Sequence, residues 1–403
     1  MPRLLEDDAL RLLHEAGLEV PHFETIASAE ASAKATTALG DKAILKALIP
    51  AGGRGKAGAV RLANSPYEAE TIANELLGQT VLHYPVTEIL VSAPIEIERE
   101  LFVSFAFDSD TRKPVLLFSA DGGVDIEIIL TDRPGSLISR PISLSVGLDK
   151  NEALAVVHQA GLSGTPADAV ATALVALWQI FTKREAELLE VNPLVLTPDG
   201  RAVAPTAVIN LDEQAMPRHD DLIAAADRIR TNGWRPLTEL EWEMRRIDAT
   251  DPGSSIRFNE FPDGDIALMV SGGGTGMSAL DALYRAGGRP ACTMDITPGR
   301  IEEKTYLATK AILSRPNVKG LLAGSPFINF IPVDVKVRGT MRALEELAID
   351  PTEFPIVFRF DGPNIDEAKQ CAAELPGICF FDAATPMEDA ATEIVRRTYG
   401  ETT

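Results

Sequence analysis

A glycine-rich stretch with three cations is the part of this chain most suited to chemistry. Residues 46–58 read KALIPAGGRGKAG, with four glycines among the last seven positions and with Lys46, Arg54 and Lys56 around them. Glycine lets the backbone turn its N–H groups toward an anion, and the cations add positive charge. Ala57 stands where a P-loop of the GxxxxGK[ST] type needs a hydroxyl for Mg²⁺. The stretch therefore predicts a phosphate-binding loop of another type; a flexible hairpin tip with solvated charges is the open alternative.

Two further stretches bring side-chain oxygens together. Glu190 and Asn192 lie two residues apart, so a strand would project both side chains to one face. Two such oxygens can share Mg²⁺, or one can hold the metal while the other meets a reacting phosphate. An Asn-Pro strand end is the structural alternative. Residues 121–127, DGGVDIE, combine paired glycines with carboxylates spaced by two, which is equally consistent with a solvated acidic edge.

Two loops in the second half follow apolar runs. Residues 271–276, SGGGTG, come after one run and open a helical pattern, and residues 324–330, GSPFINF, come after another. The free N–H groups at a helix start attract a phosphate or a carboxylate. A generic tight turn between strand and helix is the alternative for the first loop.

Composition excludes several classes of function. The 403 residues contain 38 Lys and Arg against 59 Asp and Glu, and this net charge of −21 opposes binding to nucleic acid or to an anionic membrane. No stretch approaches membrane-spanning length. Cys292, Cys371 and Cys379 are odd in number and show no metal-ligand spacing, which indicates core thiols in a reducing compartment. We expect a cytoplasmic protein.

The first two motifs are positioned by a domain over residues 1–230. Apolar periodicity predicts helices at residues 4–16, 29–39, 66–77 and 168–182, and strands at 43–46, 88–91, 100–107, 114–119 and 187–196. Residues 20–95 form a smaller α/β subdomain within it. The glycine-rich stretch joins two of its strands.

The periodicity weakens after this domain and then becomes regular. We expect a linker at residues 231–262, within which residues 237–247 have a short helical pattern. From 263 to 403 five strands, near residues 266–270, 291–294, 320–323, 356–360 and 377–380, alternate with five helical patterns. This alternation predicts a parallel, doubly wound sheet, in which ligands lie beyond the carboxyl ends of the strands.

Four of these stretches, in this order and spacing, resemble the β subunits of ADP-forming succinyl-CoA synthetase and their relatives, the amino-terminal part of ATP-citrate lyase and citryl-CoA synthetase. The resemblance covers nearly the whole chain and is carried by residues 51–58, 122–127, 190–195 and the loop at Ser271. Residues 218–219, 235–238 and 323–330 look nearer to the citrate lyase branch. The resemblance implies an ATP-grasp fold followed by a flavodoxin-like CoA-ligase domain.

The resemblance also implies roles for individual residues. Lys46, Gly53, Arg54 and Gly55 would hold the phosphates of ATP, and Glu100 would lie in the nucleotide site. Asn192 would bind Mg²⁺, and Glu190 would face a phosphohistidine during transfer. The resemblance places that histidine on an α-type partner. The five histidines of this chain sit outside every motif. The residues implied in binding the acid are Ser271, Gly272, Gly273, Gly274, Asn329, Phe330 and Arg359.

The chain departs from the family pattern at several positions. Thr206 stands where a second Mg²⁺ carboxylate is expected, so metal binding would depend on Asp212 or another carboxylate. Ser92 replaces the acidic residue that contacts the nucleoside. Phe360 follows Arg359 where the citrate lyase branch has a further arginine, and Ile331 replaces a threonine. Losing a bidentate cation disfavours a tricarboxylate such as citrate.

These observations lead to one expected function with two alternatives. We expect the β-type subunit of an ADP-forming carboxylate–CoA ligase that uses ATP, Mg²⁺ and coenzyme A, forms a hetero-oligomer with its α-type partner, and activates a small di- or hydroxy-carboxylic acid. The first alternative is a degenerate ATP-grasp subunit with a scaffolding or regulatory role. The second is an ATP-citrate lyase or citryl-CoA synthetase subunit.

Overall fold

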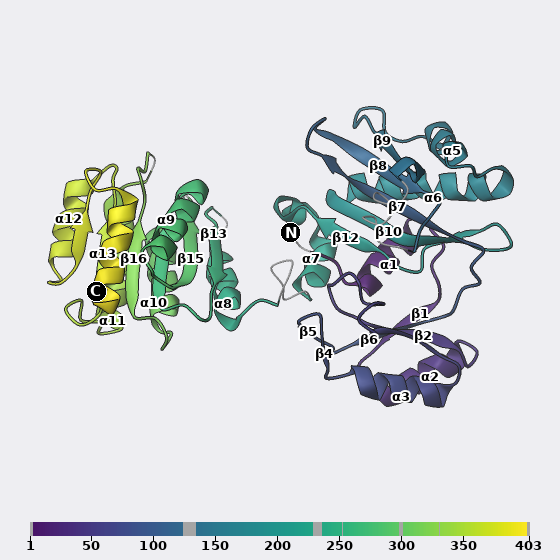
Figure 1. Cartoon of the computed structure of the whole chain (residues 1–403), viewed down its shortest axis with the longest axis horizontal. Helices are drawn as coiled ribbons and strands as arrows, with labels where there is room; N and C mark the ends of the chain where they lie inside the picture. Colours follow the sequence, from purple (N-terminus) through teal and green to yellow (C-terminus); the bar gives the residue numbers. More distant parts are fainter. Residues whose placement is uncertain are drawn as a thin grey trace. The chain divides into compact units, whose positions relative to one another are not determined.

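The chain forms two compact units, Met1–Pro236 and Leu237–Thr403, each with its own sheet structure and cores (Figure 1). The computed structural model describes residues 3–123, 134–228, 236–251, 253–297, 301–329 and 331–400. Within these ranges no helix has the length and apolar character needed to cross a bilayer.

A small antiparallel sheet carries the glycine-rich stretch of the first unit. Its strands β1 (Phe23–Ile26), β6 (Ile89–Ser92), β2 (Ala43–Ala47) and β3 (Val60–Ala63) lie in the order β1-β6-β2-β3. Helices α2 (Ala29–Ala38) and α3 (Pro66–Leu76) pack side by side against this sheet (Figure 1). Ser28 and Ser65 cap the two helices by accepting from the N–H groups of Ala31 and Glu68, which fixes where each helix begins.

A larger antiparallel sheet forms the rest of the first unit. Its strands lie in the order β11-β10-β7-β8-β9, and β12 pairs with β10. Their bounds are β7 (Arg99–Asp108), β8 (Lys113–Ser119), β9 (Leu137–Pro141), β10 (Ala186–Leu196), β11 (Ala202–Val203) and β12 (Val208–Leu211). Helix α6 (Gly164–Lys183) packs on this sheet, and its Trp178 lies 5.8 Å from the Phe105 ring centre. Helix α5 (Lys150–Gln159) packs beside α6.

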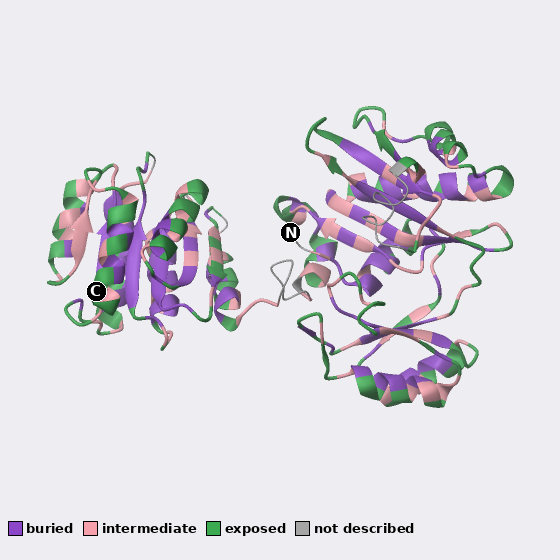
Figure 2. Cartoon of the chain, viewed as in Figure 1, coloured by how far each residue is buried: buried purple, intermediate pink, exposed green. Residues whose placement is uncertain are grey.

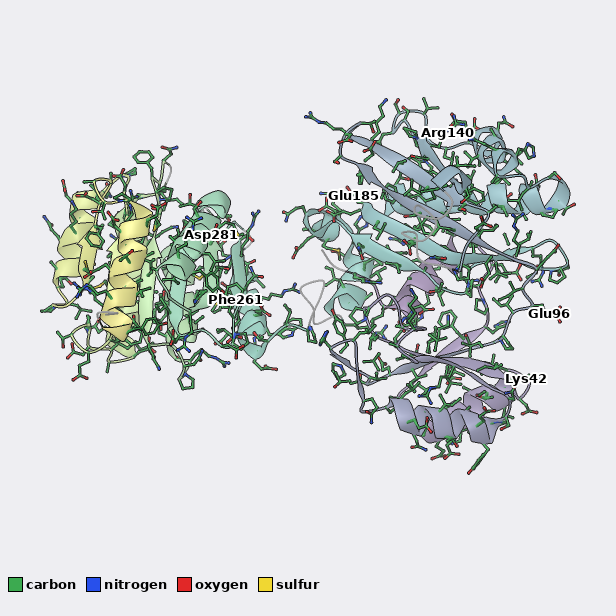
Figure 3. The ribbon with its side chains drawn as sticks, viewed as in Figure 1. Lys42, Glu96, Arg140, Glu185, Phe261 and Asp281 are labelled. Atoms are coloured by element: carbon green, nitrogen blue, oxygen red, sulfur yellow. The ribbon has the colours of Figure 1, made fainter. Side chains whose placement is uncertain are left out.

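Short elements complete this unit. Helix α1 (Glu6–Glu15) opens it, and α7 (Asp220–Asp227) follows the 3-10 helix η2 (Glu213–Arg218). A two-stranded ribbon joins β4 (Thr80–Val81) to β5 (Tyr84–Pro85), and η1 (Pro134–Ser136) precedes β9. The segment between β6 and β7 carries Glu96, labelled in Figure 3.

The second unit is a doubly wound sheet with strand order β13-β15-β14-β16-β17-β18. Strands β14 (Ile266–Val270), β15 (Pro290–Ile296), β16 (Gly320–Gly324), β17 (Ile356–Arg359) and β18 (Cys379–Phe381) pair in parallel. They alternate with α9 (Gly273–Arg285), α10 (Ile301–Leu313), α11 (Val333–Glu346), α12 (Ile365–Ala373) and α13 (Met387–Tyr399). Every residue of β14 and β16 is buried (Figure 2). The predicted parallel sheet is confirmed.

Two elements lie inside the residues for which the sequence predicted a linker. Helix α8 (Glu239–Asp248) matches the short helical pattern at residues 237–247, and β13 (Ile256–Glu260) pairs antiparallel with β15 as an edge strand. The capping box between Thr238 and Glu241 fixes the start of α8. The second unit therefore begins at Leu237, earlier than the expected residue 263.

The middle of the second sheet also holds a buried thiol. Cys292, on β15, is 1% exposed, and burial raises the pKa of this thiol to about 12. The other two cysteines are half-buried, and all three are free thiols.

Candidate functional site

A cleft of about 870 Å³ is lined by strands of both sheets of the first unit. It brings together every site residue that the sequence predicted in that half, far apart as they are along the chain. These lining residues are Lys46, Gly53, Arg54, Gly55, Glu100, Glu190, Asn192 and Thr206. Ser92, at the end of β6, lines the same cleft and donates from its hydroxyl to the Ile44 carbonyl at 3.5 Å.

The glycine-rich stretch leaves β2 and returns at β3 through tight turns. Gly53 and Gly58 have φ angles of 72° and 71°, a region that side chains with a Cβ rarely adopt. The Ala57 N–H donates to the Gly53 carbonyl, and the Ala59 N–H donates to the Arg54 carbonyl. This turn carries Arg54 back over the strand end, where its guanidinium donates to the Ala47 carbonyl at 3.2 Å.

A carboxylate from the first helix meets the two main cations of the cleft. Glu6 Oε1 lies 2.7 Å from Lys46 Nζ, and its other oxygen pairs with Arg54. Lys46 Nζ also donates to the Pro205 carbonyl at 2.7 Å. Burial alone would raise the pKa of Glu6, but the charges and hydrogen bonds of Arg54 and Lys46 lower it to about 2. Sequence reasoning missed Glu6, because the acid lies 40 residues from Lys46.

Arg3 adds a further cation near this group. Burial and the charge of Arg54 lower the pKa of Arg3, while nearby anionic groups, among them Glu190 and Glu6, oppose that shift. The backbone of Arg3 forms a bridge with Asn210 of β12. The N-terminal segment therefore contributes charges of both signs around the cleft.

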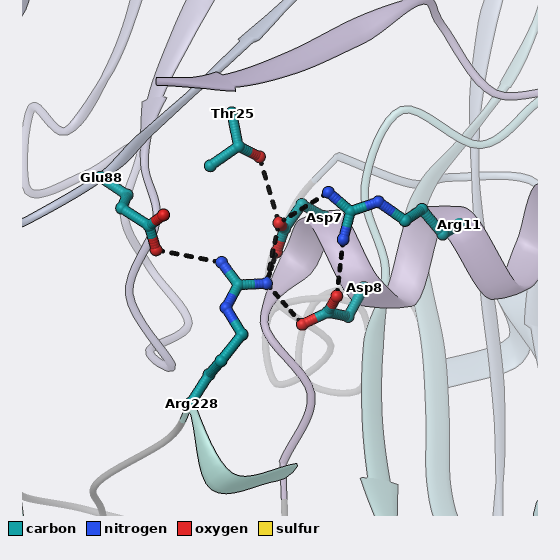
Figure 4. A network of polar contacts seen from close by, with 6 residues as sticks. All are labelled: Asp7, Asp8, Arg11, Thr25, Glu88 and Arg228. Atoms are coloured by element: carbon teal, nitrogen blue, oxygen red, sulfur yellow. Dashed lines mark hydrogen bonds and ion pairs between the residues drawn. The ribbon is translucent and has the colours of Figure 1, made fainter. Parts of the chain in front are cut away.

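A polar network fastens helix α1 and so fixes the position of Glu6 (Figure 4). Arg228 Nη1 lies 2.9 Å from Asp7 Oδ2 and 2.6 Å from Asp8 Oδ2, and its Nη2 lies 3.0 Å from Glu88 Oε2. Thr25 donates to Asp7 at 3.1 Å. The network joins α1, strand β1, the residue before β6 and the residue after α7.

Strand β10 carries Glu190 and Asn192 into the cleft. Asn192 Oδ1 accepts from the Gly123 backbone N–H at 2.9 Å. Gly123 has a φ of 71°, and a Cβ at this position would collide with the Glu100 carboxylate. Gly123 thus lets the backbone approach both side chains, and Gly122 lets it approach the backbone of Leu101. The acidic half of that motif, residues 124–127, lies outside the described residues.

Among the described residues, few oxygen ligands are available to a metal in this cleft. Thr206 is half-buried and offers a neutral hydroxyl. Asp212, the suggested substitute, caps η2 by accepting from the Gln214 N–H at 2.8 Å. Among the described ranges there is no cluster of three His, Cys, Asp or Glu side chains. Asn192 and Glu190, two residues apart on β10, offer oxygen donors of the kind that Mg²⁺ prefers, and Glu100 lines the same cleft.

A second hollow of about 960 Å³ in the same unit contains none of the predicted site residues. It shares Ala93, Pro94 and Ile95 with the cleft and includes two histidines, His14 and His22. Its arginines, Arg11 and Arg201, are about half exposed and already paired, with Asp8 and Glu19 respectively. The chemistry expected from the sequence is concentrated in the smaller cleft.

In the second unit the predicted acid-binding residues follow the carboxyl ends of neighbouring strands. Ser271 follows β14, and α9 begins after Gly272, whose N–H donates to Asp295 Oδ1 at 3.1 Å. Gly273 and Gly274 form the first turn of α9, and Asn329 is exposed in the loop after β16. Phe330 lies outside the described residues.

Arg359 is engaged differently from what the sequence suggested. This side chain is 8% exposed and donates to three backbone carbonyls, those of Thr385, Ser325 and Pro326, at 2.6 to 2.9 Å. Its guanidinium therefore ties two loops together.

Comparison with known proteins agrees with this geometry. Residues 3–196 match the ATP-grasp domain. The β subunit of the ADP-forming succinate–CoA ligase of Rubrobacter xylanophilus is 33% identical over 371 residues, which are 92% of each chain. The corresponding subunit of Chloroflexus aggregans is 36% identical over 390 residues, 96% of each chain. The chain belongs to this family.

Membership of the succinate–CoA ligase β-subunit family confirms the predicted resemblance, the ATP-grasp fold and the class of ADP-forming acid–CoA ligase. A solved structure of ATP citrate lyase from Methanothrix soehngenii, in complex with citrate and coenzyme A, superposes with a TM-score of 0.79 at 22% identity. It covers 99% of this chain and 100% of that chain, so both share one fold.

Proposed function

We propose that this chain is the nucleotide-binding β-type subunit of an ADP-forming carboxylate–CoA ligase that works with an α-type partner in the cytoplasm. The observation that carries this proposal is the convergence of Lys46, Arg54, Glu190 and Asn192 on one cleft. Cations and backbone amides beside two oxygen-bearing side chains are the groups that a phosphoryl transfer needs. The partner, the acid and coenzyme A are inferred from the family and from the second unit.

The proposed reaction divides thioester synthesis into three displacements. A histidine of the partner subunit attacks the γ-phosphorus of ATP, and ADP leaves. A carboxylate oxygen of the acid then takes the phosphoryl group and releases the histidine. The thiolate of coenzyme A attacks the acyl carbon, phosphate leaves, and the thioester forms. Each step is a displacement at an activated centre.

The residues of this chain serve the first displacement. Lys46 and Arg54 neutralise charge on the phosphates, and the amides of the loop at residues 53–55 orient them. Glu190 holds the partner's imidazole in the protonation state that transfer requires. Mg²⁺, held by Asn192 beside the phosphates, would supply further neutralisation of the transferring group.

The second unit is proposed to hold the acid. Its binding groups are the amides at the start of α9 and the loop around Asn329. Phe360 is 3% exposed and packs in the apolar core, and Ile331 packs against the same core. Neither side chain supplies the cation or the hydroxyl that would help to hold a third carboxylate. This favours a dicarboxylic acid or a smaller hydroxy acid over citrate and counts against the citrate lyase alternative.

Reconstitution with an α-type subunit tests this proposal. With labelled ATP and Mg²⁺, the complex should form acid-labile phosphohistidine before any acid is added. Addition of a suitable acid and coenzyme A should discharge the label and form a thioester. Absence of phosphohistidine in the complete complex, at every nucleotide and Mg²⁺ concentration tried, would contradict the proposal.

A degenerate subunit that scaffolds its partner is the second candidate. Two observations favour it: Thr206 at the expected metal position, and the pairing of Lys46 and Arg54 with Glu6. Thermal melting with ATP, with and without Mg²⁺, separates the two candidates because a ligand that binds the folded state raises its stability. A melting temperature that no nucleotide changes would favour the scaffold.

A further inference from the structure

A buried lysine in the second unit has little to neutralise it. Lys336, in the first turns of α11, is 5% exposed. Within the described part of the chain, the acceptor that its amine reaches is the hydroxyl of Ser271. An ammonium group has three donors, and burying its charge is costly unless anions or several acceptors surround it.

Lys304 in the same unit provides the comparison. It is 1% exposed, and its amine donates to Asp248 Oδ1 at 2.8 Å and to the carbonyls of Asp251 and Ser254 at 2.8 and 2.7 Å. Lys304 is thus a buried lysine that the fold itself satisfies. Lys336 lacks that arrangement among the described residues, which indicates that a ligand supplies the acceptors that the fold does not.

Lys336 lies where an anion would be bound. Ser271 follows β14, and its N–H donates to the Gly324 carbonyl at the end of the paired strand β16. Helix α9 begins two residues after Ser271 with no side-chain cap, so its first N–H groups are available to a ligand. The carboxyl ends of two adjacent parallel strands therefore meet a buried cation and a helix N-terminus.

A second hydroxyl next to Ser271 and Lys336 has no hydrogen-bond partner among the described residues. Ser325, the residue after β16, is 1% exposed, and its hydroxyl has no hydrogen-bond partner among the described residues. A buried hydroxyl without a partner is uncommon in a folded protein and points to a ligand that completes it. Asp295, which accepts from the Gly272 N–H, is the acid that faces this group and keeps part of the charge of Lys336 balanced.

We propose that Lys336 binds the carboxylate of the acid substrate that is not activated, and thereby selects dicarboxylic over monocarboxylic acids. This inference rests on the proposed function and names the substrate class of its second unit. It assigns to Lys336 the role in acid binding that the family resemblance implied for Arg359, whose guanidinium is occupied by three carbonyls. Burial lowers the pKa of Lys336 to about 8 and Asp295 opposes the shift, so a bound carboxylate stabilises the protonated amine.

Steady-state kinetics of the reconstituted complex test the proposal with three acids of equal length: succinate, malate and butyrate. Lys336→Met should raise the KM for the two dicarboxylates roughly 10- to 100-fold and leave that for butyrate unchanged, because a charge-assisted hydrogen bond is lost. Lys336→Arg should restore most of the dicarboxylate preference. Lys310→Met, which removes an exposed lysine of α10, is the matched control. Wild-type kcat/KM for a dicarboxylate should fall above about pH 8, and the Lys336→Arg variant should not show this fall.

Two readouts separate this inference from the proposed function. Formation of phosphohistidine from ATP needs no acid, so Lys336→Met should leave it unchanged; its absence in the wild type would refute the function instead. Binding to the full chain, measured by melting with succinate, butyrate or inorganic phosphate, needs no turnover. Succinate should raise the melting temperature of the wild type and not of Lys336→Met. Equal KM ratios in the Lys336 and Lys310 variants, or stabilisation by inorganic phosphate but not by succinate, would overturn the inference.

A second variant guards against loss of folding in Lys336→Met. Ser325→Ala removes one oxygen from a buried position and should raise the KM for dicarboxylates several-fold with little change in the melting temperature. An unchanged KM in a folded Ser325→Ala variant, together with an unchanged KM in Lys336→Arg and Lys336→Met, would show that the acid binds elsewhere.

Discussion

Glu6 Oε1 lies 2.7 Å from Lys46 Nζ, and the same carboxylate pairs with Arg54. The first helix of the chain thus places its own anion between the two cations that are proposed to hold a triphosphate. Glu6 is 4% exposed and Lys46 is 7% exposed, so this pairing takes place out of water, where charges interact strongly. A nucleotide that binds here competes with an internal carboxylate.

Replacing that carboxylate should change the response to nucleotide. Glu6→Gln leaves Lys46 and Arg54 buried without their anion, so we expect the melting temperature without ligand to fall, at a cost of about 3 kcal/mol. ATP should then raise the melting temperature by more in the variant than in the wild type, because its phosphates replace the missing charge.

Glu30→Gln is the matched control, because Glu30 forms an exposed pair with Lys34 on α2 and should change neither quantity. A nucleotide response that is equal in Glu6→Gln and the wild type would show that Glu6 does not compete with the phosphates.

The same carboxyl group should make stability depend on pH. Its folded-state pKa of about 2 lies below the unfolded value of 4.5, so its contribution is complete above about pH 4.5. As pH falls from 4.5 toward 2 the unfolded chain takes up the proton first, and about 3 kcal/mol of stability is lost. Urea unfolding at pH 7 and pH 3 should show a larger loss in the wild type than in Glu6→Gln. Parallel losses in both proteins would contradict the assignment.

The network around Arg228 should hold α1 in place. Arg228→Met removes contacts to Asp7, Asp8 and Glu88, and we expect a loss of about 2 kcal/mol because these acids are left partly buried. Hydrogen exchange of the α1 amides should accelerate in this variant. Arg11→Met, which removes a half-exposed arginine bonded to Asp7 and Asp8, should have a smaller effect on both measurements.

A carboxylate at position 206 should strengthen metal binding. Thr206→Asp places a hard anionic oxygen in the cleft that Asn192 and Glu190 also line. In melts with ATP, we expect this variant to need several-fold less Mg²⁺ for half of the maximal stabilisation. Thr206→Asn has a similar shape without the charge and should behave like the wild type. If both variants respond to Mg²⁺ alike, the metal does not contact position 206.

Local patterns predicted much of this structure. The glycine loop, the Glu190 and Asn192 strand and the turn after β14 are each defined by residue types within a few positions, so their places in the fold were predictable. The roles of these residues remain predictions. The pairings of Lys46 with Glu6 and of Lys336 with Ser271 span 40 and 65 residues, and no local residue spacing predicts such contacts.

The expected linker at residues 231–262 also shows that local composition does not predict a strand that depends on a distant partner. β13 has an alternating pattern of half-buried and exposed residues, and it lies among Asp, Pro and Gly residues that are typical of loops. Its identity as a strand comes from pairing with β15, more than 30 residues later in the chain. Edge strands of this kind are recognised by their neighbour and not by their own composition.

The burial of Cys292 turns this thiol into a reporter. With a pKa of about 12 and 1% exposure, it reacts with an alkylating reagent only when the second sheet opens, whereas Cys371 and Cys379 are half-buried. In a chain carrying serine at those two positions, the rate of alkylation of Cys292 measures how often the second sheet opens. Ligand occupancy in the second unit thereby becomes readable from a single sulfur atom.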